Sequence, residues 1–151
     1  MTRRIVQTAA GAALYEVMVE TAALFFRMRA AGKRAGLVTS WGGGIWGFLR
    51  SLKLHGPATV PQLARLRPVA RQRIQRLADE AAGAGLIEFL DNPAHKRSRL
   101  LRLTPAGETA FAEMDARVKA IAERLTEGLD EQELRTTAKV LKQLRDKLGG
   151  V

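Results

Sequence analysis

The sequence has 151 residues, 46% of them hydrophobic, which is enough for one hydrophobic core and too little for two comfortable domains. Its formal net charge of +10 and pI of about 11.0 favour a polyanionic partner, nucleic acid ahead of an anionic membrane surface. The lack of cysteine excludes disulfides, thiolate metal sites and thiol redox switches. It is compatible with a protein of the reducing cytoplasm.

The C-terminal third of the chain is nearly neutral, and the excess of basic charge lies upstream of it. Residues 60–102 carry nine Lys or Arg against four acids, whereas residues 103–151 carry eight against nine. The start, with Arg3 and Arg4 before an apolar run, resembles an export signal, but Glu16 and Glu20 interrupt the apolar sequence beyond it. No stretch reaches the length needed to span a bilayer, so we expect a soluble, cytoplasmic protein without a membrane partner.

Two helices are predicted before the basic segment. The first lies within residues 8–31 and the second ends at His55-Gly56-Pro57, because apolar residues recur at helical spacing in both. The link between them contains Gly42-Gly43-Gly44, which we interpret as a flexible loop, since it lacks the lysine and preceding strand of a phosphate-binding loop. The apolar stripes are Leu14, Val17, Met18, Phe25 and Met28, then Ile45, Phe48, Leu49 and Leu52.

Two further helices lie in the basic segment. Pro61 suits the first turn of a short third helix, whose inward residues are Leu63, Ala64 and Leu66. The fourth is predicted from Pro68 to Ala84 and has a basic outer face at its N-terminal half. Its inward residues are Ile74, Leu77, Ala78 and Ala81, and its outward residues include Gln72, Arg73, Arg76 and Asp79.

A hairpin and two more helices complete the chain. Alternating residues at 87–89 and 101–103 predict two strands joined by a long basic tip, DNPAHKRS. Thr104 and Pro105 are typical of a helix start, and Asp130 with Glu133 has the spacing of a capping box before the last helix.

This order places a helix-turn-helix directly before a two-stranded wing, an arrangement that presents a helix to the major groove of DNA. The alternative is that the charged run is only the solvated face of a surface helix. Two adjacent basic elements favour the DNA-binding interpretation. The predicted base-edge residues are Gln72, Arg73 and Arg76, with Arg71 and Gln75 alongside, and the predicted backbone contacts of the wing are Lys96, Arg97 and Arg99.

Residues 57–111 resemble the signature block of the MarR family of transcription regulators. The resemblance is carried by Gly85-Leu86-Ile87 after the fourth helix and by Leu103, Thr104 and Gly107, which match Leu-Thr-x-x-Gly. It implies a homodimer, a recognition helix from Pro68 to Ala84 and a wing arginine at Arg97. We therefore expect a mainly α fold with a small two-stranded β wing, in one unit over residues 1–151: a winged helix-turn-helix lobe at 41–104 flanked by dimerisation helices at 1–40 and 105–151.

The sequence leaves two features of the site open. His95 stands where many relatives have an aspartate that braces the wing arginine; its protonation would make wing contact pH-sensitive, and a loop histidine without a role is the alternative. The resemblance also implies a pocket for a small aromatic effector. Its candidate lining is Tyr15, Phe25, Trp46 and Phe48, with ordinary core packing as the alternative.

We expect no enzyme activity, metal site or cofactor, since the two histidines are not clustered with acids and no serine lies in a nucleophile motif. The leading hypothesis is a sequence-specific regulator of transcription, a repressor that binds double-stranded DNA at an inverted repeat and is released by a small molecule. The alternatives are a nonspecific architectural DNA-binding protein and a winged-helix module for protein interaction.

Overall fold

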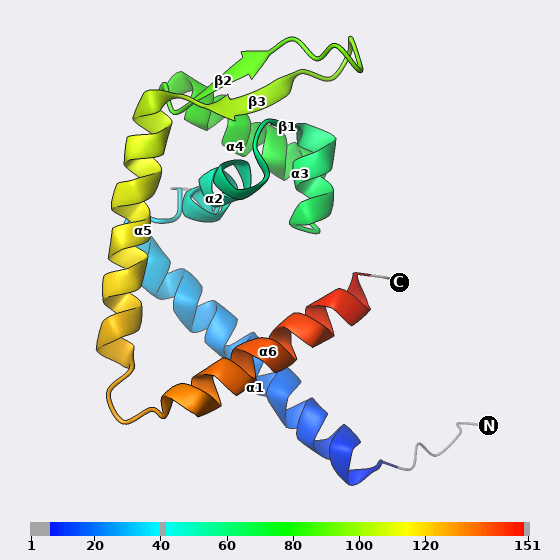
Figure 1. Ribbon diagram of the computed structural model, residues 1–151, viewed down its shortest axis with the longest axis vertical. Helices are drawn as coiled ribbons and strands as arrows, with labels where there is room; N and C mark the ends of the chain where they lie inside the picture. Colours follow the sequence, from blue (N-terminus) through cyan, green and yellow to red (C-terminus); the bar gives the residue numbers. More distant parts are fainter. Residues whose placement is uncertain (1–6, 40–41, 150–151) are drawn as a thin grey trace, which may run out of the picture. The chain divides into compact units, whose positions relative to one another are not determined.

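The computed structural model describes residues 7–39 and 42–149, so the predicted unit boundaries at 1, 40, 41 and 151 lie outside the described residues. The described residues form six helices and three strands (Figure 1). In chain order these are α1 (Ala9–Arg34), α2 (Ile45–His55), β1 (Ala58–Thr59), α3 (Val60–Leu66), α4 (Arg71–Gly83), β2 (Ile87–Leu90), β3 (Leu100–Leu103), α5 (Pro105–Leu125) and α6 (Glu131–Leu148).

The structure divides into two compact units, Met1–Met114 and Asp115–Val151, with the boundary inside α5. The core of the first unit lies between α2, α3, α4 and the sheet, and the predicted inward stripes of α2 and α4 are all buried in it. The expectation for α3 is half right. Leu63 and Ala64 are buried, whereas Leu66 is 50% exposed because it lies four residues after Gln62, on the same outer face of the helix.

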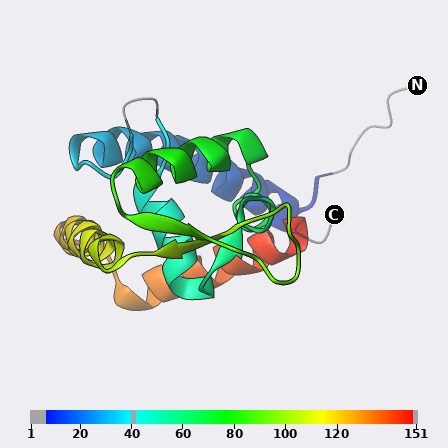
Figure 2. The ribbon, with the colours of Figure 1, turned by 90° about the horizontal axis from the view of Figure 1, so that it is seen from above.

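The sheet is antiparallel and has the order β1-β3-β2. Strands β2 and β3 confirm the predicted hairpin, with Ile87 opposite Leu103 and Phe89 opposite Leu101. The sequence did not indicate β1, in which Ala58 pairs with Leu101, because two residues are too few to display an alternating pattern. In the view from above, the hairpin lies beside α4 (Figure 2).

Pro61 lies in the first turn of α3, as predicted, whereas the start of α4 differs from expectation. Thr59 and Gln62 form a reciprocal capping box at α3, the Thr59 N–H donating to Gln62 Oε1 at 2.8 Å. The pattern Thr-x-x-Gln is the signal that could have predicted it. Helix α4 starts at Arg71 rather than near Pro68, because Ala70 is still extended, with ψ 137°, and Val69 N–H bonds back to Ala64.

Helix α1 is longer than expected and ends at Arg34. It is long and apolar enough to cross a membrane by length and composition, which corrects the expectation that no stretch is. Glu16 and Glu20 do not prevent this, because two charges in an 18-residue window leave the segment apolar overall. Helices that pack in protein interiors have the same composition, so this property alone does not assign α1 to a membrane.

The second unit consists of the end of α5, a turn and α6. As predicted, Asp130 caps α6 and accepts a hydrogen bond from Glu133 N–H at 2.9 Å. Several large apolar side chains of this segment are exposed: Leu125, Leu129, Leu134, Val140 and Leu148.

Candidate nucleic-acid interface

Helix α4 presents one polar face to solvent because its opposite face is fixed in the core. Ile74 and Ala78 are fully buried, so the helix cannot rotate without exposing them. The five side chains predicted to contact bases are all exposed: Arg71, Gln72, Arg73, Gln75 and Arg76. All five side chains are therefore accessible to a partner.

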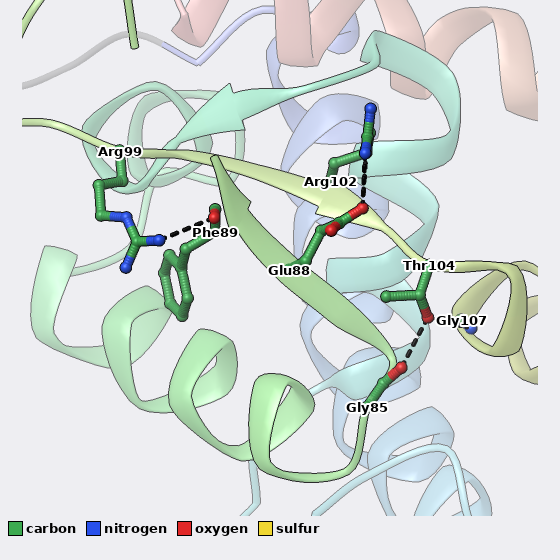
Figure 3. A network of polar contacts seen from close by, with 7 residues as sticks. All are labelled: Gly85, Glu88, Phe89, Arg99, Arg102, Thr104 and Gly107. Atoms are coloured by element: carbon green, nitrogen blue, oxygen red, sulfur yellow. Dashed lines mark hydrogen bonds and ion pairs between the residues drawn. The ribbon is translucent and has the colours of Figure 1, made fainter. Parts of the chain in front are cut away.

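The end of α4, the wing and the start of α5 are joined by one threonine (Figure 3). Thr104 Oγ1 donates to the carbonyl of Gly85 at 2.6 Å and accepts from Gly107 N–H at 3.0 Å. Gly107 is buried, and a Cβ there would collide with the carbonyl oxygen of Leu86. The Leu-Thr-x-x-Gly motif thus fixes the wing relative to the end of α4 and the start of α5.

The base of the wing is cross-braced. Arg102 Nη2 bonds to Glu88 Oε1 at 2.7 Å between directly opposed residues of β3 and β2. Arg99 donates to the carbonyl of Phe89 at 2.8 Å, and its guanidinium lies 5.1 Å from the centre of the Phe89 ring (Figure 3). Arg99 is consequently held close to the sheet.

The wing tip is organised by Asn92, which sequence reasoning missed. Its side-chain Nδ2 donates to the carbonyl of Ser98 at 2.9 Å, and its Oδ1 accepts from Ala94 N–H at 3.1 Å. An asparagine before proline is a common turn signal and could have indicated this role. His95 and Arg97 are exposed at this tip, and no contact in the described part of the chain braces the Arg97 side chain.

Two hollows bring most of the predicted residues together. The first, of about 640 Å³, lies between α4 and the wing, and its lining includes Arg71, Gln72, Gln75, Arg97 and Arg99. The second, of about 520 Å³, surrounds the start of α4 and is lined by Val69, Ala70, Gln72, Arg73 and Arg76. Lys96 is exposed and lines neither.

Several of these side chains already have protein partners, including two on α4. Arg73 Nη2 donates to the carbonyl of Gly42 at 2.9 Å, and Gln75 Nε2 donates to Asp79 Oδ1 at 2.8 Å. Each bond would have to be exchanged or shared when the side chain contacts a base.

The four aromatics predicted to line an effector pocket lie in different surroundings. Phe48 is fully buried in the core, Trp46 is half-buried, and Tyr15 and Phe25 are exposed on α1. Neither of the two hollows includes any of them. In the described ranges, no group of three or more His, Asp or Glu residues could hold a metal ion.

The fold and this surface define a winged helix-turn-helix protein. The model of the MarR family matches residues 46–98. The crystal structure of a MarR family transcription regulator is 34% identical, with a TM-score of 0.75 over 91% of both chains. The chain belongs to the MarR family of transcription regulators.

Two other relatives extend the comparison. An uncharacterized protein of Mycobacterium bovis is 36% identical over 86 residues, which is 57% of this chain and 60% of the relative; the match thus spans less than two thirds of that protein. A mutant MarR from E. coli, crystallised with operator DNA, shares the fold, with 22% identity and a TM-score of 0.67 over 87% of this chain and 97% of that one.

Proposed function

We propose that this protein is a sequence-specific DNA-binding repressor of transcription that acts as a homodimer on an inverted-repeat operator and is released by a small aromatic compound. The observation that carries the DNA-binding part is the first hollow, where arginine and glutamine side chains of α4 face arginines of the wing. Its lining includes only one acid, Asp79, which is bonded to Gln75.

The two elements divide the work of recognition. Arg73 and Arg76 have the forked geometry that binds guanine, and Gln72 has the paired donor and acceptor that bind adenine. The wing carries arginine and lysine at its tip, where they reach phosphates or the narrow minor groove. Sequence reading is therefore assigned to α4 and sequence-independent affinity to Lys96 and Arg97.

The proposed homodimer is supported by the exposed apolar surface of the terminal helices. Helix α1 has a series of large apolar side chains in solvent, including Phe26, which is 70% exposed. Such a series marks a surface that another protein or a membrane covers, and in this proposal a second copy of the chain covers it. Two-fold symmetry would then place two copies of α4 on half-sites about one helical turn apart.

Selection of binding sites from a randomised duplex library, at near-physiological salt, tests the proposal. We expect an inverted repeat, because a symmetric dimer reads the same half-site twice. The doubly substituted Arg73→Ala, Arg76→Ala protein is the comparison, and it should lose the motif while keeping weak, salt-dependent binding. Tight binding with no recoverable motif would contradict sequence reading.

That contrary result would favour a nonspecific architectural role, for which the net charge of +10 is the specific observation. The two functions differ in salt dependence as well as in sequence. An architectural protein would bind random and selected duplexes equally, with the same steep salt slope.

A further inference from the structure

Two helical arginines, Arg29 and Arg73, and Arg67 at the end of α3 lie beside the glycine-rich segment 42–47. Arg29 of α1 and Arg73 of α4 both donate to the carbonyl of Gly42, at 3.0 and 2.9 Å. Arg67, directly after α3, lies against α2, where a Cβ added to Gly47 would be only 2.5 Å from Arg67 Nη1. Glycine at position 47 is what leaves room for this guanidinium.

Arg73 carries a charge that is close enough to repel each of the other two arginines. Arg29 Nη2 and Arg73 Nη2 bond to the same oxygen, so these two atoms are no farther apart than the two bond lengths together. Burial, followed by the neighbouring charge of Arg73, lowers the pKa of Arg67. Each positive charge raises the cost of holding the other two in place.

Acidic partners are absent around Arg29 and Arg67 in the described part of the chain. Arg67 is half-buried, yet within residues 7–39 and 42–149 it makes no hydrogen bond or ion pair, and no carboxylate there pairs with Arg29. A guanidinium has five N–H donors, and no side-chain nitrogen of the described residues is buried without a partner, so the unbonded donors of Arg67 reach solvent and are open to a ligand. The arrangement suits a ligand with negative charge and several acceptor oxygens.

We propose that Arg29, Arg67 and Arg73 form a binding site for a phosphate-type oxyanion. Such an ion would accept hydrogen bonds from Arg67 and neutralise part of the charge that the three side chains share. The proposal rests on these contacts and on the small glycine residues beside them, and it does not depend on which DNA sequence α4 reads.

Two sources could supply this oxyanion, and they have different consequences. A phosphate of the DNA backbone would bind here while α4 contacts bases. A free phosphate-bearing ion would instead hold Arg73 toward the loop and reduce its contact with DNA, because Arg73 also lines the hollow at the start of α4.

Calorimetric titration of the full-length protein with inorganic phosphate, at constant ionic strength and without DNA, tests the site. We expect saturable binding that Arg67→Ala weakens about tenfold or more, as for the loss of charge-assisted hydrogen bonds. Gly47→Ala should weaken it too, because the new methyl group displaces the guanidinium without removing its charge. Arg65→Ala is the matched control: Arg65 is an exposed arginine two residues away, and this variant should bind as the parent protein does.

Absence of saturable binding would overturn the proposal, and so would an equal loss in Arg65→Ala, which would indicate an effect of net charge alone. Thermal melting checks that each variant folds, and Arg67→Lys, which keeps the charge, should retain part of the affinity. A DNA titration then separates the sources. If Arg67→Ala lowers the affinity for DNA and its salt slope, the oxyanion is a DNA phosphate. If Arg67→Ala binds DNA as the parent protein does until inorganic phosphate is added, the oxyanion is a free ion.

Discussion

Arg73 in α4 donates a hydrogen bond to the carbonyl of Gly42, 31 residues earlier in the chain, at 2.9 Å. The bond ties the proposed recognition helix to the loop after α1, where Arg29 donates to the same oxygen. A base-reading role for Arg73 thus requires that this bond be exchanged or shared, which couples the loop to DNA recognition.

Replacement of Arg73 with alanine should cost about 1 to 3 kcal/mol of binding to a selected DNA site and relax the preference at one base pair. Fluorescence anisotropy with a panel of single-base variants of the site measures both effects. Arg65→Ala, which removes an exposed arginine of α3 outside both hollows, is the control and should leave the order of preferences intact. A uniform loss over all sites for Arg73→Ala would assign this residue to phosphate contact instead.

The wing arginine should behave differently. Arg97→Ala is expected to weaken binding to selected and random duplexes alike and to lower the slope of log K against log salt by about 0.9, the value for one phosphate contact. Arg99→Ala should also disturb the wing, because Arg99 is bonded to Phe89. DNA titrations of the Arg97→Ala and Arg99→Ala variants at several salt concentrations measure the slope for each. An unchanged slope for Arg97→Ala would contradict its assigned phosphate contact.

Two glycines provide a matched pair for stability. Gly107→Ala should destabilise the protein by about 1 to 3 kcal/mol or more, because the methyl group meets the backbone carbonyl of Leu86, which already accepts from Thr104 N–H. Gly83→Ala, at the exposed end of α4 with nothing within 4 Å, should instead stabilise it by about 0.5 to 1 kcal/mol. Urea unfolding measures both, and equal effects would argue against the close approach at Gly107.

Loss of the Thr104 hydroxyl removes its bond to Gly85, just after α4, and its bond to Gly107, in the first turn of α5. We expect Thr104→Val to cost about 1 to 2 kcal/mol of unfolding free energy, since a helix cap is lost and the Gly85 carbonyl loses its donor. Thr109→Val is the control, because the exposed Thr109 hydroxyl bonds only to Pro105 one turn earlier in the same helix. Thermal melts of the two variants should differ clearly, with Thr109→Val close to the parent protein.

The sequence predicted the elements whose burial has a clear period. Ile74 and Leu77 in α4 and Phe89 in β2 repeat at the spacing of their element, so their environment can be read from local pattern. The pairing of Ala58 with Leu101 and the position of Arg67 against Gly47 join segments far apart in the chain, and no local pattern encodes them. The arginines of α4 could be selected as site residues because the helical period assigns them to the outer face. The bond from Arg73 to Gly42 joins distant segments and could not be predicted in this way.

Assembly can be tested on the apolar surface of α1. Phe26 is 70% exposed, so Phe26→Glu should leave the folded chain intact while it places a charge in the proposed dimer contact. We expect sedimentation at micromolar concentration to show a dimer for the parent protein and a shift toward monomer for the variant. Leu54→Glu, at an exposed leucine of α2, is the control and should stay dimeric. A parent protein that sediments as a monomer would contradict the homodimer, and a Phe26→Glu variant that stays dimeric would place the contact elsewhere. Because the operator is proposed to be an inverted repeat, a monomeric variant should also bind the isolated half-site as tightly as the full site.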